Sequence, residues 1–354
     1  MRLSSRLIKS TIELMCLFLS ILDIFLFKRW ILVGSSLAYF IFDYLRYRRE
    51  ATLNFQESRG LREQMRLQDI LAIERKYSLR EDFSSFEKHV EARTPLDRYF
   101  YYAKYECVRN LILTYGMKGG LCLDLGCGFG EDTFYLAQHI SRNVIGLELD
   151  EVKLSRARRK LQGEGRSLPV TFCVGDALQS PFRSERFDTI LMTEVLEHLI
   201  DPERGIENCR YLLKEGGVLI VSTPSRHNMN YTINPFLLLE KVVSLLTEKV
   251  LPPYHGLHAR FEYDRKRPEP EYGIHYHFSQ KQLRRMVTQN QFHVLWEGSF
   301  EIEIPPYLYL ERFLKGDVEK IRKVVRPLER VLQKIPLINR FGQHLLLVAQ
   351  KRSS

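Results

Sequence analysis

The stretch Cys122-Leu-Asp-Leu-Gly-Cys-Gly-Phe-Gly130 is the most informative segment of this 354-residue chain. Its apolar residues predict a short buried strand around Asp124. Its three glycines predict a tight turn, because a residue without a Cβ atom lets the backbone turn sharply and approach a ligand closely. Glu131 and Asp132 follow, and acidic residues favour the first turn of a helix. A strand, a glycine-rich turn and a helix in this order are typical of nucleotide sites, although such turns also occur in folds that bind nothing.

Strands and helices are predicted to alternate after this turn. The predicted strands cover residues 143–149, 169–174, 186–193 and 217–223, and the predicted helices cover residues 151–162 and 202–213. Two more strands are predicted at 291–296 and 343–349, with a basic helical stretch around 318–333 between them. Such alternation predicts a doubly wound α/β sheet.

Several later motifs, together with the glycine-rich turn, carry a family resemblance. They are Gly146-Leu-Glu148, Gly175-Asp-Ala177, Phe187-Asp188, Glu194-Val-Leu-Glu-His198 and Leu213-Lys-Glu-Gly-Gly217. In this order they resemble the class I S-adenosylmethionine (SAM) methyltransferases, over residues 105–225 and most closely in the branch that acts on quinones, lipids and similar small molecules. The resemblance implies a Rossmann-like, doubly wound, seven-stranded sheet with an antiparallel last strand. It also implies SAM as the cofactor and methyl transfer as the reaction.

The resemblance assigns individual residues to the cofactor site. Asp124 and the backbone around Gly126 and Gly128 would hold the amino-acid end of SAM. Glu148 would accept both ribose hydroxyls, because an ionised carboxylate is a pure acceptor that can take two donors at once. Asp176 would accept the adenine amino group. The other residues assigned to the cofactor site are Cys127, Leu149, Ala177 and Thr193.

Residue spacing bears on which nucleotide the turn could bind. The third glycine follows the second by two residues, so the turn lacks the longer Gly-x-Gly-x-x-Gly form that cradles the pyrophosphate of a nicotinamide cofactor. Glu148 lies 22 residues after Gly126, close to the separation of about 20 residues expected for a carboxylate that binds a ribose. Each acid also has a simpler interpretation: Asp124 as a helix cap, Glu148 as a solvated strand end, and Asp176 as a turn residue.

Glu194, Glu197 and His198 are the candidate catalytic residues. Methyl transfer is a displacement that depends mainly on alignment, and a base is needed only where the acceptor must lose a proton. Helical spacing would place Glu194 and His198 on one face. Three interpretations stay open: a general base, a divalent-cation site like the one that Glu-x-x-Glu-His forms in some methyltransferases, or a cap for the helix that begins at Asp201-Pro202. No metal is assigned. A histidine of the run 273–279 could also lie near the substrate, with Ser279 as a helix N-cap being the alternative.

Residues 1–50 are predicted to form a membrane-associated helical hairpin. Its apolar runs, 11–27 and 30–45, contain 17 and 16 residues and are short against the roughly 20 residues that a full span needs. Three acidic residues interrupt them: Glu13, Asp23 and Asp43. The flanking basic residues suit the anionic cytoplasmic leaflet, and SAM is made in the cytoplasm, so we expect the catalytic domain on that side. A secretory signal peptide and a soluble helical pair buried on the catalytic domain are the alternatives.

The rest of the chain divides into two predicted regions. Residues 51–104 read as a helical linker and N-terminal cap, and residues 105–354 as the methyltransferase domain. An insertion at about 225–273 would cover the substrate side. The aromatic run 99–105 either lines an apolar acceptor site or packs its helix against the sheet. The six cysteines form no Cys-x-x-Cys pair and read as core residues.

Composition completes the functional prediction. The net charge of +10 comes from Lys and Arg residues that are dispersed and concentrate near the hairpin, so we expect a membrane surface as a partner and not nucleic acid. The sequence does not specify an oligomeric state. It predicts a membrane-associated SAM-dependent methyltransferase that acts on a hydrophobic small molecule, a lipid or a quinone-type acceptor. An RNA or protein methyltransferase and a non-catalytic membrane interaction protein are the alternatives.

Overall fold

The structure is a computed structural model, and its described residues are 95–163, 168–225, 277–302, 317–335 and 338–353. The predicted hairpin at 1–50, the linker as far as residue 94 and nearly all of the insertion at 225–273 lie outside these ranges. Within them, no helix combines the length and the apolar character that crossing a membrane requires.

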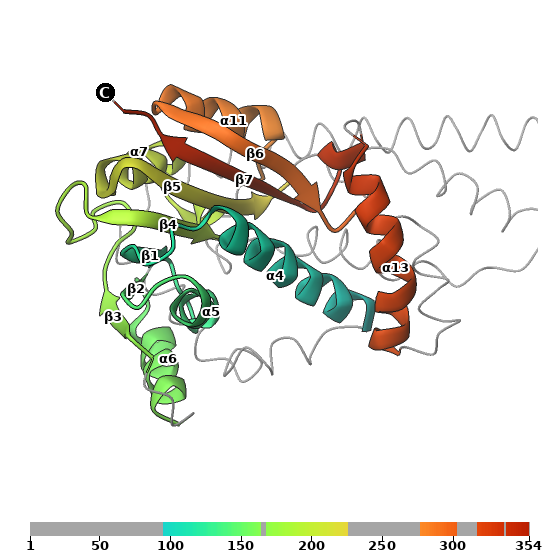
Figure 1. Ribbon diagram of the computed structural model, residues 1–354, viewed down its shortest axis with the longest axis horizontal. Coiled ribbons are helices and arrows are strands. Elements are labelled where there is room, and N and C mark those ends of the chain that lie inside the picture. Colours follow the sequence, from blue (N-terminus) through green and yellow to red (C-terminus); the bar gives the residue numbers. More distant parts are fainter. Residues whose placement is uncertain (1–94, 164–167, 226–276, 303–316, 336–337, 354) are drawn as a thin grey trace, which may run out of the picture. The chain divides into compact units, whose positions relative to one another are not determined.

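Seven strands in the described part of the chain form one sheet (Figure 1). They are β1 (Cys122–Leu125), β2 (Val144–Glu148), β3 (Val170–Val174), β4 (Phe187–Thr193), β5 (Leu213–Pro224), β6 (Phe292–Phe300) and β7 (His344–Lys351). Their spatial order is β3-β2-β1-β4-β5-β7-β6. β1 to β5 pair in parallel, whereas β7 is antiparallel to both of its neighbours, β5 and β6. The predicted Rossmann-like sheet with an antiparallel last strand is confirmed.

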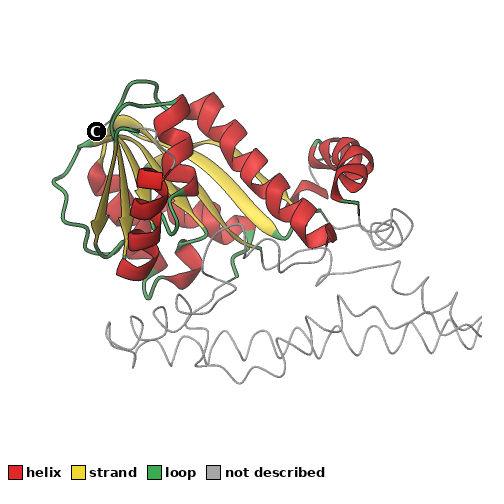
Figure 2. Ribbon diagram, turned by 90° about the horizontal axis from the view of Figure 1, so that it is seen from below, coloured by secondary structure: helices red, strands yellow, loops and turns green. Residues whose placement is uncertain are grey.

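Helices cover both faces of the sheet (Figure 2). Helices α4 (Pro95–Tyr115) and α5 (Glu131–His139) pack on one face, and α7 (Pro202–Leu212) and α11 (Gln280–Gln289) on the other. The remaining described helices are α6 (Glu151–Gly163), α13 (Val318–Gln333) and the short 3-10 helices η2 (Leu196–His198) and η3 (Ile338–Arg340). On β5, Leu219 and Val221 belong to the core under α7 and α11, while Val218 and Ile220 belong to the core under α4 and α5. Burial on both faces explains why the strand is a continuous apolar run.

The structure moves some element boundaries. β5 begins at Leu213, ahead of the predicted start at 217, and β6 continues to Phe300, beyond the predicted end at 296. Helix α4 runs unbroken across residue 105, where the catalytic domain was predicted to begin. Near its start, Tyr99 and Phe100 pack with buried residues of α13, Ile321 and Val325, so this part of the aromatic run holds two helices together.

The direction of β7 determines which residues meet at the ligand-binding edge of the sheet. In doubly wound sheets, ligands bind at the carboxyl ends of the parallel strands. Because β7 is antiparallel, its first residue, His344, lies at this edge and pairs with Pro224 of β5 and Phe300 of β6. The edge therefore combines the ends of the parallel strands with the start of the last strand.

Candidate active site

The glycine-rich turn joins β1 to α5 at the carboxyl edge of the sheet. Gly126 and Gly128 have φ angles of 80° and 52°, in the left-handed region that favours glycine. A Cβ atom on Gly126 would lie 2.3 Å from Cγ2 of Val195, so the backbone is closely packed there. A Cβ atom on Gly128 would meet nothing within 4 Å in the described structure, so space remains beside the turn at that point.

The Glu148 carboxylate ties this turn to the end of β2. Its Oε2 accepts a hydrogen bond from the Gly128 N–H at 2.8 Å, and its Oε1 accepts from the N–H groups of Leu149 at 3.0 Å and Asp150 at 3.1 Å. The residue is 9% exposed, so the interpretation as a solvated strand end is wrong. Oε1 has both lone pairs engaged and Oε2 keeps one, so binding two ribose hydroxyls would require one backbone bond to lengthen.

Asp124 is buried at the end of β1 and linked to α5. Its Oδ2 accepts a hydrogen bond of 2.5 Å from Oγ1 of Thr133, in the first turn of that helix. Burial and the nearby charge of Asp132 raise the pKa of Asp124 to about 8. Asp124 therefore links β1 to the first turn of α5, but it is not the helix cap of its simpler interpretation, because the N-cap is Gly130. With this pKa it carries a proton for much of its time at neutral pH.

The remaining residues assigned to the cofactor lie along the same edge. Asp176 follows β3, and its Oδ1 accepts from the Leu178 N–H at 2.8 Å, which is the predicted turn interaction. The Ala177 carbonyl accepts from Asn208 Nδ2 at 2.7 Å. Cys127 is buried and donates its backbone N–H to the Leu147 carbonyl.

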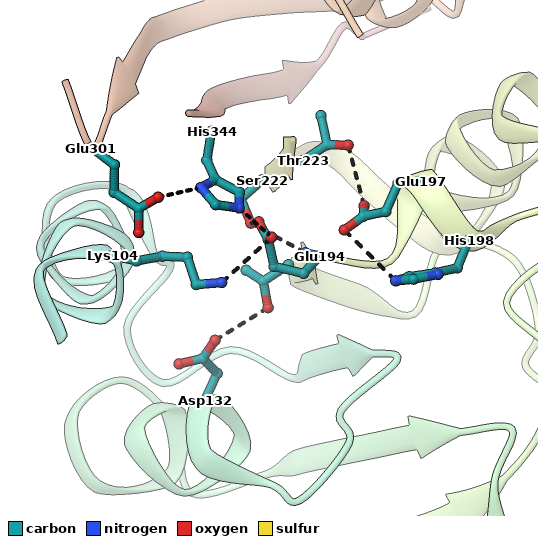
Figure 3. Close-up of polar contacts among 10 residues, drawn as sticks. Lys104, Asp132, Glu194, Glu197, His198, Ser222, Thr223, Glu301 and His344 are labelled. Carbon is teal, nitrogen blue, oxygen red and sulfur yellow. Dashed lines mark hydrogen bonds and ion pairs between the residues drawn. The ribbon is translucent and has the colours of Figure 1, made fainter. Parts of the chain in front are cut away.

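Glu194 forms the centre of a cluster of charged residues (Figure 3). It has a φ of 55° and precedes η2, so the predicted helical face shared by Glu194 and His198 is wrong. The left-handed conformation reverses the chain at the end of β4. Its Oε1 accepts from Ser222 Oγ at 2.7 Å, and its Oε2 lies 3.0 Å from His344 Nε2 and 3.4 Å from Lys104 Nζ. Burial would raise the pKa of Glu194, but the charges of His344 and Lys104 outweigh it and hold the pKa well below its usual range.

His344 is a member of this cluster that sequence analysis did not single out. Its Nδ1 lies 2.7 Å from Oε2 of Glu301, and its ring stacks on Phe300 with centroids 5.2 Å apart. Burial would lower the pKa of His344, but the charges of Glu194 and Glu301 raise it to about 9. At neutral pH it is an imidazolium that donates from both nitrogens. It is therefore a poor proton acceptor, and so is Glu194, whose ionised state is so strongly stabilised.

Glu197 and His198 occupy a separate position beside the cluster. Glu197 is 1% exposed and accepts from Thr223 Oγ1 at 3.2 Å, and burial together with the Glu194 charge raises its pKa well above the usual range. His198 Nε2 lies 3.9 Å from Glu197 Oε1, and the His198 side chain is 40% exposed. The proposed cap of α7 is supplied by neither residue, because Asp201 itself accepts from the Arg204 N–H.

The three candidate catalytic residues do not converge on one point. The Glu194 carboxylate is engaged by Ser222, Lys104 and His344, whereas Glu197 bonds to Thr223. In the ranges that the structure describes, no three His, Cys, Asp or Glu side chains are arranged to hold a metal ion.

The histidine-rich run at 273–279 is described only from residue 277. Ser279 is the N-cap of α11 and forms a capping box with Gln282, as one of the two interpretations predicted. The five described cysteines are free, and Cys122, Cys127 and Cys209 are buried, as predicted for core residues.

Comparison with known proteins gives matches centred on this site. Residues 123–221 match the family model of a methyltransferase domain. The ubiquinone biosynthesis O-methyltransferase of Coxiella burnetii is 36% identical over 115 residues, which are 32% of this chain and 48% of that protein. The protein of the same name from Dinoroseobacter shibae is 33% identical over 119 residues, 33% of this chain and 46% of its own. The chain thus spans about half the length of these relatives.

A sterol methyltransferase and a solved structure also match the chain. A sterol 24-C-methyltransferase of Aspergillus fumigatus is 34% identical over 104 residues, 29% of this chain and 28% of that protein. The crystal structure of a SAM-dependent methyltransferase from Mesorhizobium loti is 18% identical, with a TM-score of 0.45 over 70% of this chain and 98% of its own.

The His344 imidazolium gives a testable pH dependence of stability. Because its pKa is raised from 6.5 to about 9, its stabilising effect is complete below pH 6.5 and disappears as the pH rises through 9. We expect His344→Gln to lower the free energy of unfolding at pH 6.5. The difference in free energy of unfolding between the variant and the parent should shrink by on the order of 2 kcal/mol as the pH rises to about 9.5. Urea unfolding at several pH values measures this difference. The same substitution at the exposed residue His293 is the control. If the difference in stability between His344→Gln and the parent did not change with pH, the raised pKa of His344 would be contradicted.

Proposed function

We propose, on the premise that residues 123–221 are a class I SAM-dependent methyltransferase domain, that the chain transfers a methyl group from SAM to a hydrophobic small molecule of the quinone or lipid type. The observation that carries the proposal is the buried Glu148 carboxylate bonded to the Gly128 N–H, with open space beside Gly128, at the carboxyl edge of the sheet. This arrangement offers a fixed anion and a glycine backbone to a nucleoside.

The residues at this edge fit the cofactor. When bound, SAM supplies a methyl group activated by a sulfonium. The ribose would lie against Glu148, and the amino-acid end against Asp124 and the turn. Asp176, at the end of the neighbouring strand β3, would exchange its bond to the Leu178 N–H for one to the adenine amino group. Each of these acceptors is already oriented by backbone or side-chain donors, and binding would exchange or lengthen some of those hydrogen bonds.

Catalysis rests chiefly on alignment. The Glu194 carboxylate is fully engaged and has a lowered pKa, and Glu197 is 1% exposed and bonded to Thr223, so neither is placed to take a proton from an acceptor. His198, with its 40% exposed side chain, is the candidate catalytic residue that remains as a base for an acceptor hydroxyl. Holding acceptor and methyl group in line can supply on the order of 7 to 11 kcal/mol of the barrier reduction.

The acceptor class rests on the relatives and on the N-terminal sequence. The named relatives are a ubiquinone biosynthesis O-methyltransferase and a sterol 24-C-methyltransferase, and quinones and sterols are hydrophobic small molecules. The apolar runs at 11–27 and 30–45 suit attachment to the membrane in which such acceptors dissolve. We therefore place the catalytic domain at the cytoplasmic surface of a membrane.

Loss of the Glu148 carboxylate should weaken SAM binding. Removing a charged acceptor of a hydrogen-bonded ribose costs about 2 kcal/mol, so we expect Glu148→Ala to raise the dissociation constant by about 30-fold or more. Calorimetric titration with SAM measures the change. Glu151→Ala, which removes an exposed carboxylate three residues away in the first turn of α6, is the matched control. If the folded parent chain does not bind SAM, the proposed function is wrong.

Methyl transfer should label a lipid-soluble product. We expect the full chain, given SAM with a radioactive methyl group and a total lipid extract, to move label into the organic phase. His198→Gln should lower this rate by about 100-fold or more while leaving SAM affinity unchanged. Label that appears instead in RNA or protein would favour the alternative acceptors.

Membrane attachment should depend on residues 1–50. In fractionated cells, we expect the full chain to sediment with membranes and to resist extraction by high salt, because apolar insertion is not screened by ions. A chain that begins at Leu61 should remain in the supernatant. A full chain found in the soluble fraction would refute this part of the proposal.

A further inference from the structure

Asp132 carries a buried oxygen that the described structure leaves without a partner. The residue is 7% exposed and lies in the first turn of α5, directly after the glycine-rich turn. Its Oδ2 accepts from Thr193 Oγ1 at 3.2 Å, a contact drawn in Figure 3. Its Oδ1 has no hydrogen-bond partner among the described residues. A buried carboxylate oxygen left unsatisfied costs free energy, so its persistence at this position needs an explanation.

The basic residues nearby do not supply the missing bond. Arg109 and Lys104 lie close enough for their charges to lower the pKa of Asp132, although burial is the larger influence and raises it. The Arg109 guanidinium is placed over the Tyr135 ring, 4.9 Å from its centroid. Lys104 pairs with Glu194. Lys104 is thus engaged elsewhere, whereas Arg109, whose Nε has no hydrogen-bond partner among the described residues, acts on Asp132 through its charge without a hydrogen bond to Oδ1.

Asp132 lies where a ligand bound at the glycine-rich turn would reach it. The next residue of α5, Thr133, donates to Asp124 at the end of β1, and Thr193 fixes Asp132 to the end of β4. Asp124 and Asp132 are close enough that the charge of Asp132 raises the pKa of Asp124. Asp124 at the end of β1 and Asp132 in the first turn of α5 are thus two neighbouring buried carboxyl groups that a cation between them would stabilise.

We propose that Asp132 is a further cofactor-binding residue, whose Oδ1 accepts a hydrogen bond from the α-ammonium group at the amino-acid end of SAM. This inference rests on the proposed function. An ammonium group fits the site because it carries a positive charge and three N–H donors, so it can bond to Asp132 and still reach Asp124 or the turn. A hydroxyl group of the acceptor is uncharged, so it would not compensate the negative charge of the carboxyl pair.

Binding of the ammonium group should therefore expel protons. The pKa is raised to about 6 for Asp132 and to about 8 for Asp124, so at neutral pH Asp132 is mostly ionised and the pair holds a proton mainly on Asp124, which an adjacent cation would displace. The charged and titratable groups around the pair are Lys104, Tyr105 and Arg109 on α4, Glu131 on α5 and Glu148 on β2.

The test compares Asp132→Asn with the parent chain, using three ligands in calorimetric titrations. SAM and S-adenosylhomocysteine both contain the ammonium group, whereas 5′-deoxy-5′-methylthioadenosine lacks the amino-acid end. We expect Asp132→Asn to weaken the first two by about 10- to 100-fold and to leave the third unchanged. An equal loss for all three would show that Asp132 is only structural. No loss for any would show that Oδ1 faces something other than the cofactor. Either result would overturn the inference.

The matched control is Glu131→Gln, in the same first turn of α5. Glu131 pairs with Lys160 at 2.6 Å, so this variant removes the same charge from the helix N-terminus without touching Oδ1 of Asp132. It should bind all three ligands as the parent does. A loss in this variant that matches Asp132→Asn would assign the effect to the helix terminus.

A measurement on the parent chain keeps the inference testable if Asp132→Asn does not fold. Titrations at pH 7 in two buffers of different ionisation enthalpy report the number of protons exchanged. SAM should release a fraction of a proton, and methylthioadenosine should release almost none. SAM binding without proton release would overturn the role of Asp132 and leave the proposed function intact. Failure of the parent to bind SAM at all would instead refute the proposed function.

Discussion

The insertion of β7 between β5 and β6 is the constraint on which the rest of the structure depends. The antiparallel strand completes the backbone hydrogen bonds of both neighbours and buries Leu345, Leu347 and Ala349 in the core under α7 and α11. Its direction also brings His344 to the edge where the parallel strands end. One strand thus completes the hydrophobic core and also supplies the His344 imidazolium to the charged cluster. A change that disturbs the packing of β7 would therefore also disturb the charges at this edge.

The charges at this edge stabilise one another in an alternating chain. Lys104, Glu194, His344 and Glu301 follow in that order, and each adjacent pair lies within 3.4 Å. A buried charge destabilises the folded state unless it has a partner of opposite charge, so loss of one member of the chain leaves its neighbour without compensation. Such an arrangement is suited to keeping the shape and the electric field at this edge of the sheet fixed. It is not suited to exchanging protons, which is why alignment carries most of the proposed catalysis.

The sequence predicts those parts of the structure that depend on local pattern. The strands follow from apolar runs, the turn follows from the glycines, and Glu148 follows from its distance in sequence to Gly126. Helical spacing failed at Glu194, because a single left-handed residue reverses the chain and sends the carboxylate towards Ser222. His344 is 150 positions away from its partner Glu194, and no spacing rule connects two residues that only a completed sheet brings together.

Asp132 illustrates a different limit of sequence reasoning. An acid just after a glycine-rich turn is expected on helical grounds alone, and this expectation is met. Its Oδ2 is satisfied by Thr193 of β4, which is distant in sequence, and its Oδ1 has no partner among the described residues. The sequence therefore predicts an acidic residue at this position. It does not predict that one carboxylate oxygen lacks a hydrogen-bond donor, because that depends on which donors the fold brings close to it.

The late position of β7 in the chain has a consequence for biosynthesis. During translation, β5 leaves the ribosome more than a hundred residues before His344, and until β7 pairs with it, the segment 218–224 presents an unpaired apolar edge. Such edges are prone to pair with other chains. Chains that end before β7 would thus carry an aggregation-prone strand and a Glu194 without its imidazolium partner, so correct folding of the sheet depends on residues 344–351.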